Sequence, residues 1–178
     1  MGQIATGALS LRRYHYEQVD ASSPYRPGAN YFQKKHIDWK ALIPLVTTRT
    51  QLEANLGTPT SGNGNIFVYE TPNEKLHVWY GAGKSLGADV CCWKVPNEML
   101  FKFEWVPKRV VPLAEMNIDL AAFQKQKAPE MVNDYYYYND NEGMTITTRI
   151  VEGEEVLLSI ERGPNSAQRE RSCRKKNC

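Results

Sequence analysis

The chain has 178 residues, of which 42% are hydrophobic, 11% aromatic and 24% charged. These values are close to those of an average soluble globular protein, so they exclude collagen-like, coiled-coil and wholly disordered chains. The formal net charge is +2, which is too small for a general nucleic-acid or membrane-surface binder whose affinity comes from many phosphate contacts. The length fits one domain with a sizeable core, which needs neither a metal nor a disulfide merely to fold.

The first 35 residues differ in composition from the rest. They are polar and turn-rich, and the run 22–28 contains two prolines and a glycine, which a helix interior or a central strand does not tolerate. We predict an extended N-terminal arm at 1–35. The N-terminus lacks the basic start of a signal peptide, and no stretch of the chain approaches the roughly 18 apolar residues of a membrane-spanning helix.

The first half of the body is predicted to begin with a short helix. Thr48 and Gln51 have the spacing of a capping box, in which the hydroxyl and the side-chain amide satisfy free backbone groups of the first turn. Gly57 favours a left-handed end, so the helix is expected over 49–56. Apolar and polar residues then alternate with the two-residue period of β-strands. Three strands are expected, at 66–69, 76–80 and 100–105.

The second half is predicted to follow the same order. Asp119 is a suitable N-cap for a second helix over 120–127. Three further strands are expected, at 135–138, 144–151 and 156–162. The last two are joined by a tight turn, where Glu152, Glu154 and Glu155 are expected to be exposed charges that keep the edge soluble.

This order of elements predicts an α+β fold with an antiparallel sheet of about six strands and two short helices. It is compatible with two similar helix-plus-strands halves. We expect a single domain at 36–165, followed by a basic C-terminal tail at 166–178. The last twelve residues hold five basic side chains and one acidic side chain, so the remainder of the chain is mildly acidic.

The run Tyr135, Tyr136, Tyr137 and Tyr138 is the most unusual feature of the sequence. In a strand it places two phenol rings on each face. Tyrosine is amphipathic and enriched at protein interfaces, so these four residues are candidates for an interaction surface. Ordinary sheet packing, with the hydroxyl groups reaching water, is the alternative.

The four cysteines fall into two clusters, Cys91 with Cys92 and Cys173 with Cys178. Neighbouring cysteines form a disulfide only with strained geometry. A bridge is therefore expected to link one cluster to the other, in an oxidising compartment. Four free thiols in a cytosolic protein are the alternative, and no C-x-x-C spacing points to zinc or redox chemistry.

Patterns for catalysis and ligand binding are incomplete. The segment 81–85 ends like a phosphate-binding loop, but Val78 stands where the first glycine of that motif belongs. The three histidines lack metal-ligand spacing, and the chain has no nucleophile elbow. We therefore expect no cofactor, no metal and no catalytic residues. The alternative is a small hydrolase-like or ligand-binding domain with a site assembled from His77, Glu70 and Arg49.

A series of short motifs runs from about residue 37 to residue 173. The motifs are Trp39, 43–49, 56–59, 69–71, 93–96, 107–109, 118–120, 136–143, 159–160, 163–164 and Cys173. In this order they resemble an uncharacterised family of secreted proteins from soil bacteria of the acidobacterial type. The resemblance implies an extracytoplasmic location and a disulfide from a mid-chain cysteine to the late one, and it brings no known activity.

A shorter resemblance concerns the predicted helix 49–56. Its Thr-Thr-Arg start and Leu-Gly-x-Pro end, followed by strands, are similar to the small envelope modules of the SmpA/OmlA and beta-lactamase-inhibitor-protein type. Those modules bind proteins through a sheet, and the likeness is an analogy at the level of the fold.

These observations predict a non-enzymatic, secreted or envelope-associated domain that acts by protein interaction. The partner is expected to be another protein or a second copy of the chain, since the arm could add a strand to a neighbouring sheet edge. Nucleic acid is not expected as a partner, because the body is net acidic and RNA stacking needs a basic sheet face.

Overall fold

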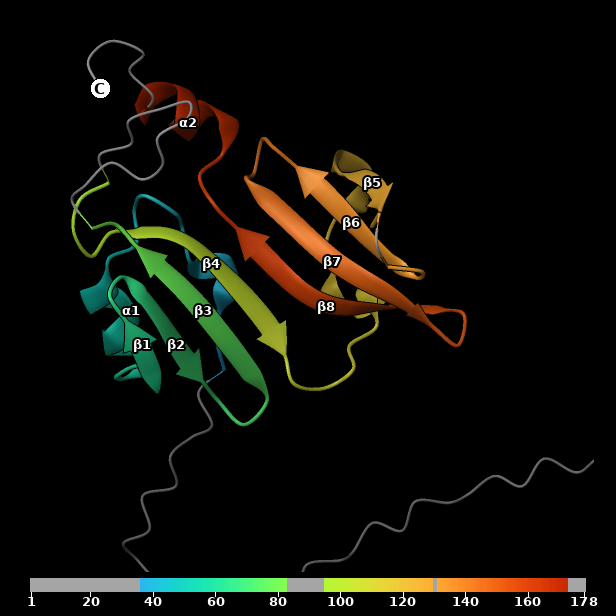
Figure 1. The fold of residues 1–178 in the computed structure, drawn as a ribbon, viewed down its shortest axis with the longest axis horizontal. Coiled ribbons are helices and arrows are strands. Elements are labelled where there is room, and N and C mark those ends of the chain that lie inside the picture. Colours follow the sequence, from blue (N-terminus) through green and yellow to red (C-terminus); the bar gives the residue numbers. More distant parts are fainter. Residues whose placement is uncertain (1–35, 83–94, 130, 173–178) are drawn as a thin grey trace, which may run out of the picture. The chain divides into compact units, whose positions relative to one another are not determined.

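The computed structural model describes residues 36–82, 95–129 and 131–172 (Figure 1). The predicted arm lies outside these residues, as do Cys91, Cys92, Cys173 and Cys178. The expected disulfide therefore stays a prediction. Among the described residues, no helix is long and apolar enough to cross a membrane.

The first predicted helix is confirmed as α1 (Arg49–Leu56). The Thr48 hydroxyl accepts the N–H of Gln51 at 3.3 Å, and the Gln51 side-chain oxygen accepts the N–H of Thr48 at 2.9 Å. Gly57, with φ of 86°, ends the helix. Before α1, the short 3₁₀ turn η1 (Trp39–Ala41) buries Trp39 in the core.

The fold is mostly β, with one open antiparallel sheet of eight strands. The strands are β1 (Ser61–Asn63), β2 (Ile66–Glu70), β3 (Glu74–Tyr80), β4 (Leu100–Pro107), β5 (Gln124–Lys127), β6 (Asp134–Asn139), β7 (Met144–Val151) and β8 (Glu154–Arg162). Their order is β1-β2-β3-β4-β8-β7-β6-β5. The sheet therefore consists of two four-stranded meanders that are joined where β4 pairs with β8. All six predicted strands are present, and β1 and β5 were not expected.

The second predicted helix is wrong. Only the three-residue 3₁₀ turn η3 (Leu120–Ala122) follows Asp119, whose carboxylate accepts the N–H of Ala121 at 3.0 Å. The next residues form β5, which pairs along its whole length with the tyrosine strand β6. The local preference of Gln and Lys for helix is outweighed because β6 offers a complete ladder of backbone hydrogen bonds.

A second α-helix occurs instead near the C-terminus, where none was predicted. Helix α2 (Ser166–Ser172) begins after Asn165. Asn165 Oδ1 accepts the N–H of Gln168 at 2.8 Å, and Gln168 Oε1 accepts the N–H of Asn165 at 2.9 Å. This reciprocal pair is a capping box, which the Asn-x-x-Gln spacing in the sequence would have indicated.

One face of the sheet is covered by helical segments, and we call it the covered face. In Figure 1, α1, η1, η2 (Leu113–Met116) and η3 lie behind the strands, whereas no described helix crosses the face turned to the viewer. The core forms between these segments and the inward side chains of the sheet. Its fully buried members include Leu52 of α1 and, on the strands, Leu76, Val78, Leu100, Phe103, Ile146 and Ile160.

Candidate functional site

The outward side of the sheet is a candidate surface, and we call it the open face. Its residues follow from the strand register, because alternate side chains of paired strands share a side. They are Ile66, Val68, Glu70, Lys75, His77, Trp79, Lys102, Glu104, Val106, Gln124, Gln126, Asp134, Tyr136, Tyr138, Thr145, Thr147, Arg149, Ser159 and Glu161. Backbone hydrogen bonds join the adjacent strands beneath these side chains.

Two aromatic pairs stand on the open face. The rings of His77 and Trp79 are stacked, with centroids 6.3 Å apart and an angle of 27° between planes. The rings of Tyr136 and Tyr138 are tilted, with centroids 5.8 Å apart. Tyr138 is 37% exposed, and the other three side chains are half-buried. Aromatic rings that are partly exposed are typical anchors of protein interfaces.

The charged side chains of the open face are largely paired with one another. Lys102 Nζ lies 2.8 Å from a carboxylate oxygen of Glu161 and 4.7 Å from the ring centroid of Trp79. Arg149 donates two hydrogen bonds to Asp134, at 2.7 and 2.9 Å. These hydrogen bonds hold the pKa of the Asp134 carboxyl below its usual value. The charges of the open face therefore nearly balance.

The tyrosine run is divided between the two faces of the sheet, as its alternation predicts. Tyr136 and Tyr138 lie on the open face, opposite Thr147 and Thr145 of β7. Tyr135 and Tyr137 lie on the covered face, where Lys125 approaches both rings, with Nζ 4.4 and 4.9 Å from their centroids. The two rings on the covered face therefore contribute to packing, and only the other two are available to a partner at the open face.

A polar cluster around Glu155 holds the outer strands together on the covered face. The carboxylate accepts hydrogen bonds from Thr148 Oγ1 at 2.6 Å, from Tyr137 OH at 2.8 Å and from Lys125 Nζ at 3.0 Å. Burial opposes ionisation of Glu155, but these three donors outweigh it and lower its pKa. The expectation that Glu155 is an exposed turn charge is wrong.

A register shift explains how Glu155 reaches this cluster. The β7–β8 ladder shifts between Thr147 and Thr148, and Glu155 then pairs with Ile150. A bulge changes which residues of a strand share a face with the partner strand, so Glu155 points inward with Thr148. A carboxylate held ionised by three donors is a poor general base or acid near neutral pH, so the cluster is a structural clamp across β5, β6, β7 and β8.

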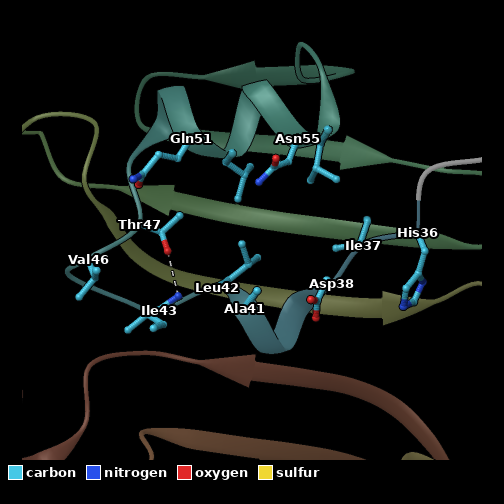
Figure 2. Close-up of a pocket in the computed structure, with 12 residues that line it drawn as sticks. His36, Ile37, Asp38, Ala41, Leu42, Ile43, Val46, Thr47, Gln51 and Asn55 are labelled. Atoms are coloured by element: carbon cyan, nitrogen blue, oxygen red, sulfur yellow. Dashed lines mark hydrogen bonds between the residues drawn. The ribbon is translucent and has the colours of Figure 1, made fainter.

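A cavity lies on the covered face, between α1 and the segment that contains η1 (Figure 2). Its volume is about 710 Å³. Apolar side chains form most of the wall, including Leu42, Leu52 and Leu56. Two of its polar side chains bond neighbouring backbone, since Thr47 Oγ1 accepts the N–H of Ile43 at 2.9 Å and Gln51 belongs to the capping box. The cavity is therefore mainly an apolar hollow between α1 and the segment before it.

The alternative enzyme-like site is not assembled. Arg49 lies over the ring of Phe67 on the covered face, with 4.1 Å between the guanidinium carbon and the centroid. His77 and Glu70 belong to the open face, and Glu70 is paired with Lys108 at 2.6 Å. Within the described residues, no group of three or more potential ligands could hold a metal ion.

Comparison with protein-family models, with curated proteins and with solved structures finds no match. The resemblances noted in the sequence therefore stay predictions, and any functional argument depends on the geometry of the two faces.

Proposed function

We propose that this chain is a non-enzymatic, extracytoplasmic protein-binding domain that self-associates through the open face of its sheet. The observation that carries the proposal is the placement of the two aromatic pairs. His77 and Trp79 lie on β3, and Tyr136 and Tyr138 lie on β6, so each pair is two strands away from β8 in the sheet order.

This spacing supports a two-fold symmetric dimer. When two open faces meet about an axis parallel to β8, the position of β3 in one copy coincides with the position of β6 in the other. Strands are about 4.8 Å apart, so each aromatic pair would lie about 10 Å from the axis. The pair around Trp79 would meet the pair around Tyr138 of the second copy, and the contact would occur twice.

The charges of the open face also support self-association. The face carries both signs, and a two-fold axis can bring positive groups of one copy against negative groups of the other. Glu104 lies directly opposite Glu161 in the β4–β8 ladder, and Lys102 bonds only the latter among the described residues. Glu104 therefore offers a carboxylate near the centre of the face.

Sedimentation equilibrium of the full-length protein tests the proposal. We expect the wild type to dimerise reversibly. The triple variant W79A/Y136A/Y138A should weaken dimerisation by at least about 30-fold, because truncating interface anchors costs about 2 kcal/mol or more. The control is V132A, which truncates a side chain that is 82% exposed and lies outside the open face. A wild type that stays monomeric, or a triple variant that dimerises like V132A, would contradict the proposal.

A further inference from the structure

Strand β5 forms one edge of the sheet. Among the described strands it pairs with β6 alone, so its other side faces no strand (Figure 1). All four of its residues are exposed. An exposed strand edge presents a row of backbone donors and acceptors that can pair with another chain.

The register with β6 determines which backbone groups of β5 point outward. The N–H of Ala128 donates to the carbonyl of Asp134 at 2.9 Å, and this pair continues the β5–β6 register. In an antiparallel pair, residues that bond the neighbouring strand alternate with residues whose N–H and C=O point away from it. Counting back from Ala128, the residues with outward groups are Lys125 and Lys127.

These outward groups match the hydrogen-bonding pattern of a further strand. Lys125 and Lys127 each provide one N–H and one C=O, and no backbone hydrogen bond between β5 and another described segment uses them. They are two residues apart, so they repeat after about 6.6 Å, the distance at which bonding residues of a strand recur. An antiparallel strand alongside β5 would exchange both of its bonds with each of them.

The side chains of β5 indicate the charge of the strand that fits. Lys125 lies on the covered face over the rings of Tyr135 and Tyr137, and alternation places Lys127 on the same face. Lys125 is paired with Glu155, whereas Lys127 forms no ion pair within the described part of the chain. Side chains of an added strand would lie about 5 Å from these two lysines. Carboxylates at alternate positions of that strand would therefore be attracted to the edge.

The same lysines argue against a second copy of β5 as the occupant. If two β5 strands paired about a two-fold axis, lysines of one copy would lie opposite lysines of the other. Like charges directly opposite one another destabilise a strand pair. Lysine on an edge strand thus prevents self-pairing and at the same time selects for a partner of opposite charge.

We infer that β5 accepts an extended acidic segment of a partner protein as an additional antiparallel strand of the sheet. The residues of that segment opposite Lys125 and Lys127 exchange backbone hydrogen bonds with them, and their carboxylates approach the two ammonium groups. The contact is made by the edge of the sheet and not by its open face. The proposed dimer and this strand addition can therefore each fail without the other.

The test uses full-length ¹⁵N-labelled protein and the synthetic peptide Thr-Val-Glu-Thr-Glu-Val-Thr with blocked ends. Its glutamates alternate, so both lie on one side of an extended chain. Amide hydrogen exchange is followed by NMR. In the protein alone, we expect the N–H groups of Lys125 and Lys127 to exchange faster than that of Gln126, which bonds β6. Saturating peptide should slow the exchange of both lysines by at least about tenfold, because both N–H groups become hydrogen-bonded.

Two control peptides separate the charge from the backbone. In the first, lysine replaces both glutamates, and the repulsion between like charges should weaken binding by at least about tenfold. In the second, both glutamates are N-methylated. This peptide keeps its charge but lacks the two donors that face β5, so it should also bind at least about tenfold more weakly.

Three protein variants test the other side of the contact. K127Q removes the charge alone and should weaken binding of the acidic peptide by about two- to fivefold. K127P also removes an outward N–H, while every bond to β6 remains, so it should weaken binding by at least about tenfold. The control K75Q makes the same change in net charge on β3, in the other meander, and should leave the affinity unchanged.

Four results would overturn the inference. The first is slow exchange of Lys125 and Lys127 in the protein alone, which would mean that the chain itself or a second copy covers the edge. The second is an acidic peptide that does not bind. The third is equal binding of the acidic and the basic peptide, and the fourth is binding that leaves the exchange of both lysines unchanged.

Discussion

The hydrogen bond from Thr148 to Glu155 provides the sharpest test of the packing on the covered face. Thr148 is completely buried, and its hydroxyl donates to the carboxylate at 2.6 Å. Replacement by valine keeps the β-branched shape and the strand preference but removes the donor. A hydrogen bond to a charged group contributes about 1.5–3 kcal/mol, so T148V should lower the free energy of unfolding by about that amount.

The neighbouring residue offers a matched control. Thr147 lies in the same strand, on the open face, and makes no side-chain hydrogen bond within the described part of the chain. T147V makes the same chemical change without the loss of a buried bond. Its effect on the free energy of unfolding should stay within about 0.5 kcal/mol.

The pH dependence of the free energy of unfolding provides a second test. The pKa of Glu155 in the folded protein is lowered from its usual value of 4.5. A lowered folded-state pKa means that this carboxylate stabilises the protein above the unfolded-state pKa, and that the stabilisation is lost as the pH falls through the folded-state pKa. The difference between wild type and T148V should therefore shrink in acid.

Urea unfolding followed by circular dichroism, at pH 7 and in steps below pH 4.5, measures both effects. Equal destabilisation by T148V and T147V would refute the clamp around Glu155. So would a difference between wild type and T148V that is the same at every pH.

Two further predictions concern other parts of the sheet. G143A should lower the free energy of unfolding by about 2 kcal/mol or more, because Gly143 has φ of 63° and a Cβ there would collide with the carbonyl oxygen of Gly163. The control is G153A, at φ of 86° with no atom within 4 Å of the added Cβ. It should lower the free energy of unfolding by less in the same urea assay. R149Q should raise the pKa of Asp134, which the hydrogen bonds from Arg149 hold below its usual value, and a carboxyl NMR titration that gives the same pKa in both proteins would contradict the pairing.

Several elements are determined by short-range signals in the sequence. The capping box of Thr48 and Gln51 places α1 at the predicted residues. The turn between β7 and β8 is also local, because Glu152 and Gly153 adopt the positive φ values, 53° and 86°, that a two-residue hairpin turn needs. The Asn165 and Gln168 pair that begins α2 belongs to the same class of signal. These features depend on residues only a few positions apart, so the sequence alone can indicate them.

Other features depend on contacts between distant segments. Strand β5 has four exposed polar residues and no apolar alternation, so only its pairing with β6 makes it a strand. The inward position of Glu155 depends on a register shift between two strands. The sequence likewise gives no sign that β4 lies beside β8, which makes Trp105 and Arg162 diagonal neighbours on the covered face. Alternation determines which side chains share a face. The order of the strands is decided by the packing of the whole sheet, because backbone hydrogen bonds are the same whichever strand becomes the partner.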